Sequence, residues 1–241
     1  MKPVLILQHM ADDGPAYLGT WLHRQAVPHE LHNAGAGQAF PERMDDFSAL
    51  AVLGGEMSAN DPLPTLRQAE RLILQAFATG RPVIGHCLGG QLMARALGAR
   101  IGPSPAPEIG WQGIEVADSV PARDWFGAIG PHQVFQWHFE AFALPEGAQA
   151  LAGSTACPVQ AFAYGPHLAM QFHVEVDAEK LVRWSRDTGA RYLHAQKHHR
   201  TVQSGSAMCD DLAERLRTQQ ALADRFYGRW LGAAARQGNF P

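Results

Sequence analysis

The chain has few cysteines, and those it has are poorly placed for a disulfide framework. Its 241 residues include three cysteines, Cys87, Cys157 and Cys209, and no C-x-x-C pair. An odd number of widely spaced cysteines argues against disulfide scaffolds and zinc sites and suits a reducing compartment. We therefore predict no metal site and a cytoplasmic location.

The chain also lacks a strong charge of either sign and any long apolar run. It has 20 basic and 23 acidic residues, a formal net charge of -3, so we expect no broad basic surface for nucleic acid. No apolar run approaches the roughly 18 residues of a membrane span. The apolar start at residues 4–7 soon meets Asp12 and Asp13, unlike a secretory signal. Nucleic-acid and membrane functions are therefore not expected.

What the sequence does contain is an alternation of strand and helix patterns. Residues 4–7 and 49–53 are short, continuously apolar runs typical of buried strands. Residues 63–78 carry apolar side chains at helical spacing, and residues 82–84 begin another strand. This alternation predicts an α/β fold with a largely parallel sheet covered on both faces.

The second half of the chain has a different character. Residues 100–176 are rich in glycine, proline and aromatics and read as short strands, some antiparallel, with one strand over residues 167–173. Residues 178–186 and 208–235 read as helices joined by a polar linker. We predict one domain over residues 1–180 and a C-terminal helical extension over residues 181–241 packed on it.

One cysteine stands at a junction between a strand and a helix. Val83 and Ile84 lead into Gly85-His86-Cys87-Leu88-Gly89, and a helical pattern follows from Gln91. This G-x-C-x-G arrangement has the form of a nucleophile elbow, in which glycines permit a sharp turn. Unpaired N–H groups and the dipole at the start of a helix favour an anion, so a reactive thiolate is expected at Cys87.

A cysteine nucleophile needs a base that is oriented by a third group. Among the twelve histidines of the chain, the best candidate is His173, two residues before Glu175. If residues 169–176 form a strand, these two side chains share one face and can meet through a local bend. Glu175 would then hold the imidazole while His173 faces Cys87.

Three segments together resemble a known family. Leu53-Gly54-Gly55-Glu56-Met57-Ser58, residues 85–91 and Gln171-Phe172-His173-Val174-Glu175 are similar in order and spacing to the class I (triad) glutamine amidotransferases. The likeness is greatest to stand-alone relatives of the glutaminase domain of GMP synthase and covers roughly residues 4–180. It implies a three-layer, flavodoxin-like sandwich with a mostly parallel central sheet, and it implies no cofactor.

The resemblance also assigns roles to residues of this chain. Cys87 would be the nucleophile, His173 the general base and acid, and Glu175 the carboxylate that orients it. The remaining implied residues are the oxyanion-hole N–H groups of Gly55 and Leu88, Gly54 for close approach, Gln91 for the amino-acid end of the substrate, and Trp137 and His138 along the pocket. The family commonly has proline where this chain has Val174, so we expect altered turn geometry there.

The function implied is hydrolysis of the side-chain amide of L-glutamine to glutamate and ammonia. No synthase pattern follows residue 180, so the ammonia would pass to a separate synthase or be released. A γ-glutamyl hydrolase or peptidase, using the same triad on a larger γ-glutamyl amide, is the alternative. A non-catalytic binding module is a third interpretation, which the intact Cys, His and Glu set disfavours.

Overall fold

The structure is a computed structural model and describes residues 2–236. One nine-stranded sheet runs through the molecule in the order β2-β1-β3-β4-β9-β8-β7-β5-β6. The strands are β1 (Val4–Gln8), β2 (His29–Asn33), β3 (Ala49–Val52), β4 (Val83–His86), β5 (Ile101–Val116), β6 (Gly130–Phe142), β7 (Gln149–Gly153), β8 (Ala161–Tyr164) and β9 (His167–Met170).

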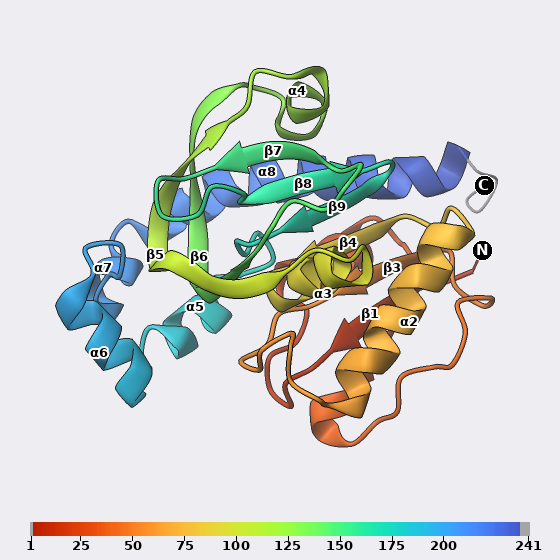
Figure 1. The fold of residues 1–241 in the computed structure, drawn as a ribbon, viewed down its shortest axis with the longest axis horizontal. Helices are drawn as coiled ribbons and strands as arrows, with labels where there is room; N and C mark the ends of the chain where they lie inside the picture. The colour runs from red at the N-terminus through yellow and green to blue at the C-terminus, as the bar shows by residue number, and fades with distance from the viewer. Residues whose placement is uncertain (1, 237–241) are drawn as a thin grey trace.

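Helices cover this sheet on both faces (Figure 1). They are α1 (Tyr17–Arg24), α2 (Pro64–Ala78), α3 (Leu88–Ala96), α4 (Val120–Phe126), α5 (Ala178–Trp184), α6 (Ala190–His198), α7 (Gly205–Cys209) and α8 (Leu212–Arg236), with a short 3-10 turn, η1 (Ala34–Ala36). Local signals explain several boundaries. Pro64 opens α2, where a missing N–H costs nothing, and the Asp177 side chain caps α5 by accepting from the Lys180 N–H.

The half of the sheet formed by β2, β1, β3, β4 and β9 is parallel. Alternate residues of β1 point to opposite faces, so Val4 and Ile6 pack with α1, α4 and α8. Leu5 and Leu7 pack with α2 and α3. These two apolar clusters make three layers, helix, sheet and helix, in agreement with the α/β sandwich that the sequence predicts.

The other half of the sheet is antiparallel. β9 pairs in parallel with β4 and antiparallel with β8, so it joins the two halves. β5 and β6 form a long ribbon that pairs from Ile101 with Phe142 to Val116 with Gly130. A third apolar cluster packs α5, α6 and α7 against this ribbon. The ribbon and these helices therefore build the part of the molecule that borders the segment after β9, where the His173 N–H donates to the Phe135 carbonyl.

The C-terminal helices form near the predicted positions, but the one helix predicted over residues 208–235 is two helices, α7 and α8, with a break at residues 210–211. The segment that reads as a polar linker contains α6, whose Tyr192 and Ala195 are buried. The α8 side chains Tyr227 and Trp230 are buried in the same cluster as β1 and α1. The domain boundary at residue 180 stays a prediction, and residues 237–241 of the predicted extension lie outside the described residues. Within residues 2–236, none of the helices has the length and apolar character needed to cross a bilayer.

Candidate active site

Cys87 occupies the sharp turn between β4 and α3. Its φ and ψ are 49° and -107°, a conformation that is costly for a residue with a side chain and persists only when its surroundings fix it. The Cys87 N–H donates to the Met170 carbonyl at 2.9 Å, and the Cys87 carbonyl accepts from the Gln91 N–H at 2.9 Å. The predicted elbow is therefore present, although α3 begins at Leu88, three residues before the predicted start at Gln91.

Glycines let α3 lie directly on the sheet. A Cβ at Gly85 would lie 2.6 Å from the Gly89 carbonyl carbon, and one at Gly90 would lie 2.5 Å from the Met170 carbonyl oxygen. A Cβ at Gly89 would collide with the Val52 carbonyl. Close helix–strand contact thus fixes the backbone that presents the thiol.

His173 and Glu175 are hydrogen-bonded to each other, with 2.6 Å between Nδ1 and Oε1. The prediction that they lie on a strand is wrong, because β9 ends at Met170 and residues 171–176 are irregular. The side chains of Phe172, Val174 and Val176 are fully buried, and those of His173 and Glu175 are buried as well. The His173 N–H donates to the Phe135 carbonyl at 2.9 Å, which ties the segment to β6.

The electrostatics of this buried pair favour the charged forms. Burial on its own would lower the pKa of His173, but the charges of Glu175 and Cys87 and a hydrogen bond with each side chain raise the pKa to about 10. Burial opposes ionisation of Glu175, and the neighbouring charge of His173 lowers its pKa nevertheless. The site is therefore arranged to hold an imidazolium between a carboxylate and the sulfur atom.

Several groups surround the sulfur of Cys87. The Gln171 side chain donates to Sγ at 3.5 Å, and the Trp137 carbonyl lies 3.7 Å from it. The backbone N–H groups of Gly55 and Leu88 donate to no acceptor within the described part of the chain. Gly54 allows His173 to approach, since a Cβ there would lie 3.0 Å from the imidazole Cε1.

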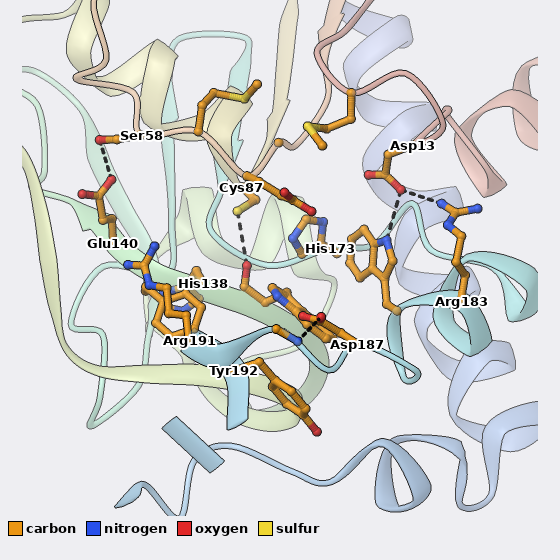
Figure 2. Close-up of a pocket in the computed structure, with 18 of the residues that line it drawn as sticks. Asp13, Ser58, Cys87, His138, Glu140, His173, Arg183, Asp187, Arg191 and Tyr192 are labelled. Atoms are coloured by element: carbon orange, nitrogen blue, oxygen red, sulfur yellow. Dashed lines mark hydrogen bonds and ion pairs between the residues drawn. The ribbon is translucent and has the colours of Figure 1, made fainter. Parts of the chain in front are cut away.

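A cavity of about 620 Å³ opens at the thiol (Figure 2). Of the residues singled out in the sequence, six line it: Gly55, Cys87, Gln91, Trp137, His138 and His173. Gly54, Leu88 and Glu175 are not part of the lining. Leu88 and Glu175 are buried, and Glu175 contacts the cavity only through His173.

The end of α5, the start of α6 and the loop that joins them supply a wall of the cavity that the sequence patterns do not predict, called below the wall between α5 and α6. Its lining residues are Arg183, Trp184, Arg186, Asp187, Gly189, Arg191 and Tyr192. The Tyr192 ring stacks on Trp137 with 5.6 Å between centroids, and the Trp184 ring meets His173 edge-on at 4.9 Å. No local pattern marks these side chains as site residues, because their partners are distant in the sequence.

Asp13 and Ser58 were also missed as site residues. Asp13 accepts from Arg183 at 2.8 Å and from the Trp184 indole at 3.1 Å. Ser58 donates to Glu140 at 2.7 Å. Ser58 is the last residue of the segment Leu53-Gly54-Gly55-Glu56-Met57-Ser58. Its place in that segment is the local signal that marks Ser58 as a candidate site residue.

Gln91 and His138 line the cavity but already have protein partners. The Gln91 side-chain nitrogen donates to the Glu140 carbonyl at 3.0 Å and to the Gln171 side-chain oxygen at 3.3 Å. His138 Nε2 lies 3.1 Å from Glu108 Oε2. The Gln91 side-chain oxygen accepts no hydrogen bond from the part of the chain that the structure describes, so it can serve a ligand.

Glu108, His138 and Cys157 place one polar atom each within 4.8 Å of one another. Glu108 already accepts from the Ser154 hydroxyl at 2.9 Å. Burial and the charge of Glu108 raise the pKa of the Cys157 thiol to about 12, which disfavours a metal-binding thiolate. We describe this cluster as a hydrogen-bonded support for β5 and β6.

The sequence model of the class-I glutamine amidotransferases matches residues 27–181. The chain belongs to this family. The glutamine amidotransferase-like protein YfeJ of Salmonella typhimurium is 33% identical over 197 residues, which are 77% of this amidotransferase and 82% of YfeJ. A crystal structure of a glutamine amidotransferase from Methylobacillus flagellatus is 34% identical, covers 97% of this chain and 95% of its own, and superposes with a TM-score of 0.91.

Relatives named GMP synthase fall into two kinds. The glutamine-hydrolysing GMP synthase of Aeropyrum pernix is 31% identical over 160 residues, 63% of this amidotransferase but only 28% of the synthase. A protein of Thermoplasma acidophilum that is named as one subunit of a glutamine-hydrolysing GMP synthase is 24% identical over 212 residues, 81% of this chain and 95% of the Thermoplasma protein. The amidotransferase thus matches a part of the longer synthase and nearly the whole of the shorter relative.

Proposed function

We propose that this amidotransferase hydrolyses the side-chain amide of glutamine through a γ-glutamyl thioester on Cys87. The observation that supports this most is the geometry of three groups. A cysteine in a strained elbow faces a buried histidine, and a carboxylate 2.6 Å away holds that histidine. This arrangement supplies a nucleophile, a proton carrier and an orienting group in one cavity.

In the first step the Cys87 thiolate attacks the amide carbon, and the carbonyl oxygen becomes an oxyanion. The free N–H groups of Gly55 and Leu88 are the donors we assign to that oxygen. Losing one such donor typically raises the barrier by about 3 to 4 kcal/mol. Gln171, which donates to Sγ at 3.5 Å, stabilises the thiolate before attack.

His173 moves the protons. As imidazolium it gives a proton to the departing nitrogen, the C–N bond breaks, and ammonia leaves. The neutral imidazole then takes a proton from water, whose oxygen attacks the thioester and releases glutamate and the Cys87 thiolate. Glu175 holds Nδ1, so that the other ring nitrogen faces the sulfur.

The amino-acid end of glutamine is assigned to the side of the cavity that contains Gln91. The Gln91 side-chain nitrogen donates to the Glu140 carbonyl, so the Gln91 side-chain oxygen can accept from the α-ammonium group of the substrate. Trp137 and His138 border this subsite through β6, and their rings are held by Tyr192 and Glu108. We propose that ammonia passes to a separate synthase, as the name of the Thermoplasma relative suggests.

The experiment is release of glutamate and ammonia from glutamine by the purified protein. Cys87→Ala removes the nucleophile and should lower kcat by roughly a thousandfold or more. Cys209→Ala is the matched control, because Cys209 is partly exposed and does not line the cavity. Retention of most activity in Cys87→Ala, with the fold intact by circular dichroism, would contradict the proposal.

A further inference from the structure

The imidazole of His173 is held by contacts of two kinds. Its Nδ1 is hydrogen-bonded to Glu175 over 2.6 Å. The indole of Trp184 packs against it, with 4.9 Å between the ring centroids and 83° between the planes, and it is the one aromatic ring within residues 2–236 that does so. A single hydrogen bond leaves a ring free to tilt about that bond, so packing against Trp184 is needed to fix the direction of Nε2.

Trp184 is the last residue of α5 and is only partly buried, so it needs a restraint of its own. Its indole N–H donates to Asp13 Oδ1 at 3.1 Å. The same oxygen accepts from Arg183 at 2.8 Å and lies 3.3 Å from the buried amine of Lys180. Asp13 therefore fixes both the end of α5 and the orientation of the indole.

The sheet brings Asp13 to the site from a distant part of the chain. Asp13 follows β1, as Cys87 follows β4 and His173 follows β9. β1, β3, β4 and β9 pair in parallel, so their carboxyl ends meet at the same edge of the sheet. Figure 2 shows Asp13 on the same side of Cys87 as His173.

We propose that Asp13 is a positioning residue for His173 and acts through Trp184. The carboxylate holds the indole, the indole fixes the plane of the imidazole, and the imidazole keeps Nε2 directed at the sulfur of Cys87. The inference rests on the proposed function, because His173 is the proton carrier of that reaction. Misplacing a reacting group by about 1 Å can cost roughly a hundredfold in rate, so a carboxylate that never touches the sulfur can still control kcat.

Two other roles of Asp13 predict different kinetics. Asp13 lines the cavity, and a residue that bound the ammonium group of the substrate would raise KM when lost. Asp13 also pairs with Arg183 and Lys180, and a residue that only anchored α5 would leave the kinetics of the folded enzyme unchanged. A positioning role lowers kcat and leaves KM near the wild-type value, because the substrate binds as before.

The first test measures kcat and KM for glutamine. We expect Asp13→Ala to lower kcat roughly ten- to hundredfold at a nearly unchanged KM. Asp13→Asn should keep more activity, because an amide oxygen can still accept from the indole. Asp46→Ala is the control, since Asp46 is exposed and does not line the cavity. A raised KM with wild-type kcat in Asp13→Ala, or wild-type values of both, would overturn the inference.

A double-variant cycle tests the route through Trp184. Trp184→Phe removes the indole N–H and should lower kcat, after which Asp13→Ala should lower it by no more than about twofold further. Two losses that multiply would overturn the inference. If Asp13→Ala does not fold, because buried Lys180 has lost its carboxylate partner, Trp184→Phe decides alone, and a wild-type kcat there would overturn the inference.

Alkylation of Cys87 by iodoacetamide separates this inference from the proposed function. Absence of glutamine hydrolysis by the wild type would overturn the proposed function, whereas alkylation needs a thiolate but no substrate. An imidazolium that faces the sulfur stabilises the thiolate, so Asp13→Ala and Trp184→Phe should slow alkylation of Cys87 at pH 7. Mass spectrometry of the peptide that contains Cys87 measures the rate. Equal rates in the wild type and both variants would overturn the inference, whether or not glutamine is hydrolysed.

Discussion

Val174 lies between the two hydrogen-bonded side chains of His173 and Glu175, and the altered turn geometry expected at this position stays a prediction. Its side chain is fully buried in the cluster that contains Phe172, so valine supplies apolar packing where the family commonly has proline. His173 and Glu175 on either side of it still meet at 2.6 Å. The sequence indicated that His173 and Glu175 form the pair, because two side chains at i and i+2 can meet in an irregular segment as well as at the end of a strand. It did not indicate that the strand ends at Met170, because hydrogen bonds to distant segments decide that.

The charge of Glu175 should set the alkaline limit of activity. The pKa of His173 is raised to about 10, so the imidazolium persists well above its usual range and is lost as the pH rises through about 10. Glu175→Gln removes the negative charge and should move the alkaline limb of kcat/KM for glutamine down by roughly one to three pH units. Glu179→Gln, at an exposed position two residues into α5, should leave the profile unchanged. An identical limb in both variants would contradict this assignment.

The elements around Cys87 are held by close backbone contact. The glycines of the elbow were predicted from their spacing, since a sharp turn next to a helix needs residues without a Cβ. The wall between α5 and α6 was not predictable, because it depends on contacts such as Tyr192 with Trp137, which lie far apart in the chain. Local periodicity carries no information about such pairings.

Gly90→Ala should destabilise the protein. The added Cβ would lie 2.5 Å from the Met170 carbonyl oxygen, so α3 would have to move off β9, at a cost of about 1 to 3 kcal/mol for overpacking. Gly228→Ala is the control, because a Cβ at that exposed position of α8 meets nothing within 4 Å and alanine favours a helix. The midpoint of urea unfolding measures both variants. Equal stability of the two would contradict the close packing of α3.

At the scale of the whole molecule, a parallel half and an antiparallel half share one sheet. The parallel half follows from alternating strands and helices, and the sequence predicted it. The long β5–β6 ribbon was predicted only as short strands, because its glycines and prolines interrupt the apolar pattern. The active-site cavity lies where the Cys87 elbow of the parallel half meets the ribbon and the helices α5 and α6, so its shape depends on both halves.

Buried histidines should make the folded state sensitive to acid. Burial lowers the pKa of His9 and of His167 to about 4. Their unfolded values near 6.5 are higher, so stability is complete above about pH 6.5 and falls as the pH drops towards 4. Each histidine should account for up to about 3 kcal/mol of that loss. Urea unfolding at pH 7 and pH 5 measures the effect.

A matched pair of variants separates this effect from general acid denaturation. His167 accepts from the Val83 N–H at 3.0 Å, and His167→Asn can keep an acceptor there without titrating. It should show a smaller loss of stability between pH 7 and pH 5 than the wild type. His23→Asn, on the exposed side of α1, should lose as much as the wild type. Equal losses in all three proteins would contradict the role of the buried histidine.

The most direct measurement of the central claim is covalent labelling of Cys87. A glutamine analogue with an electrophilic carbon in place of the amide should label the wild type with one molecule per chain. Mass spectrometry should find the added mass on the peptide that contains Cys87. Cys87→Ala should take up none, and Cys209→Ala should be labelled like the wild type. Absence of labelling in the wild type, or labelling that persists in Cys87→Ala, would contradict the assignment of Cys87 as the nucleophile that attacks glutamine.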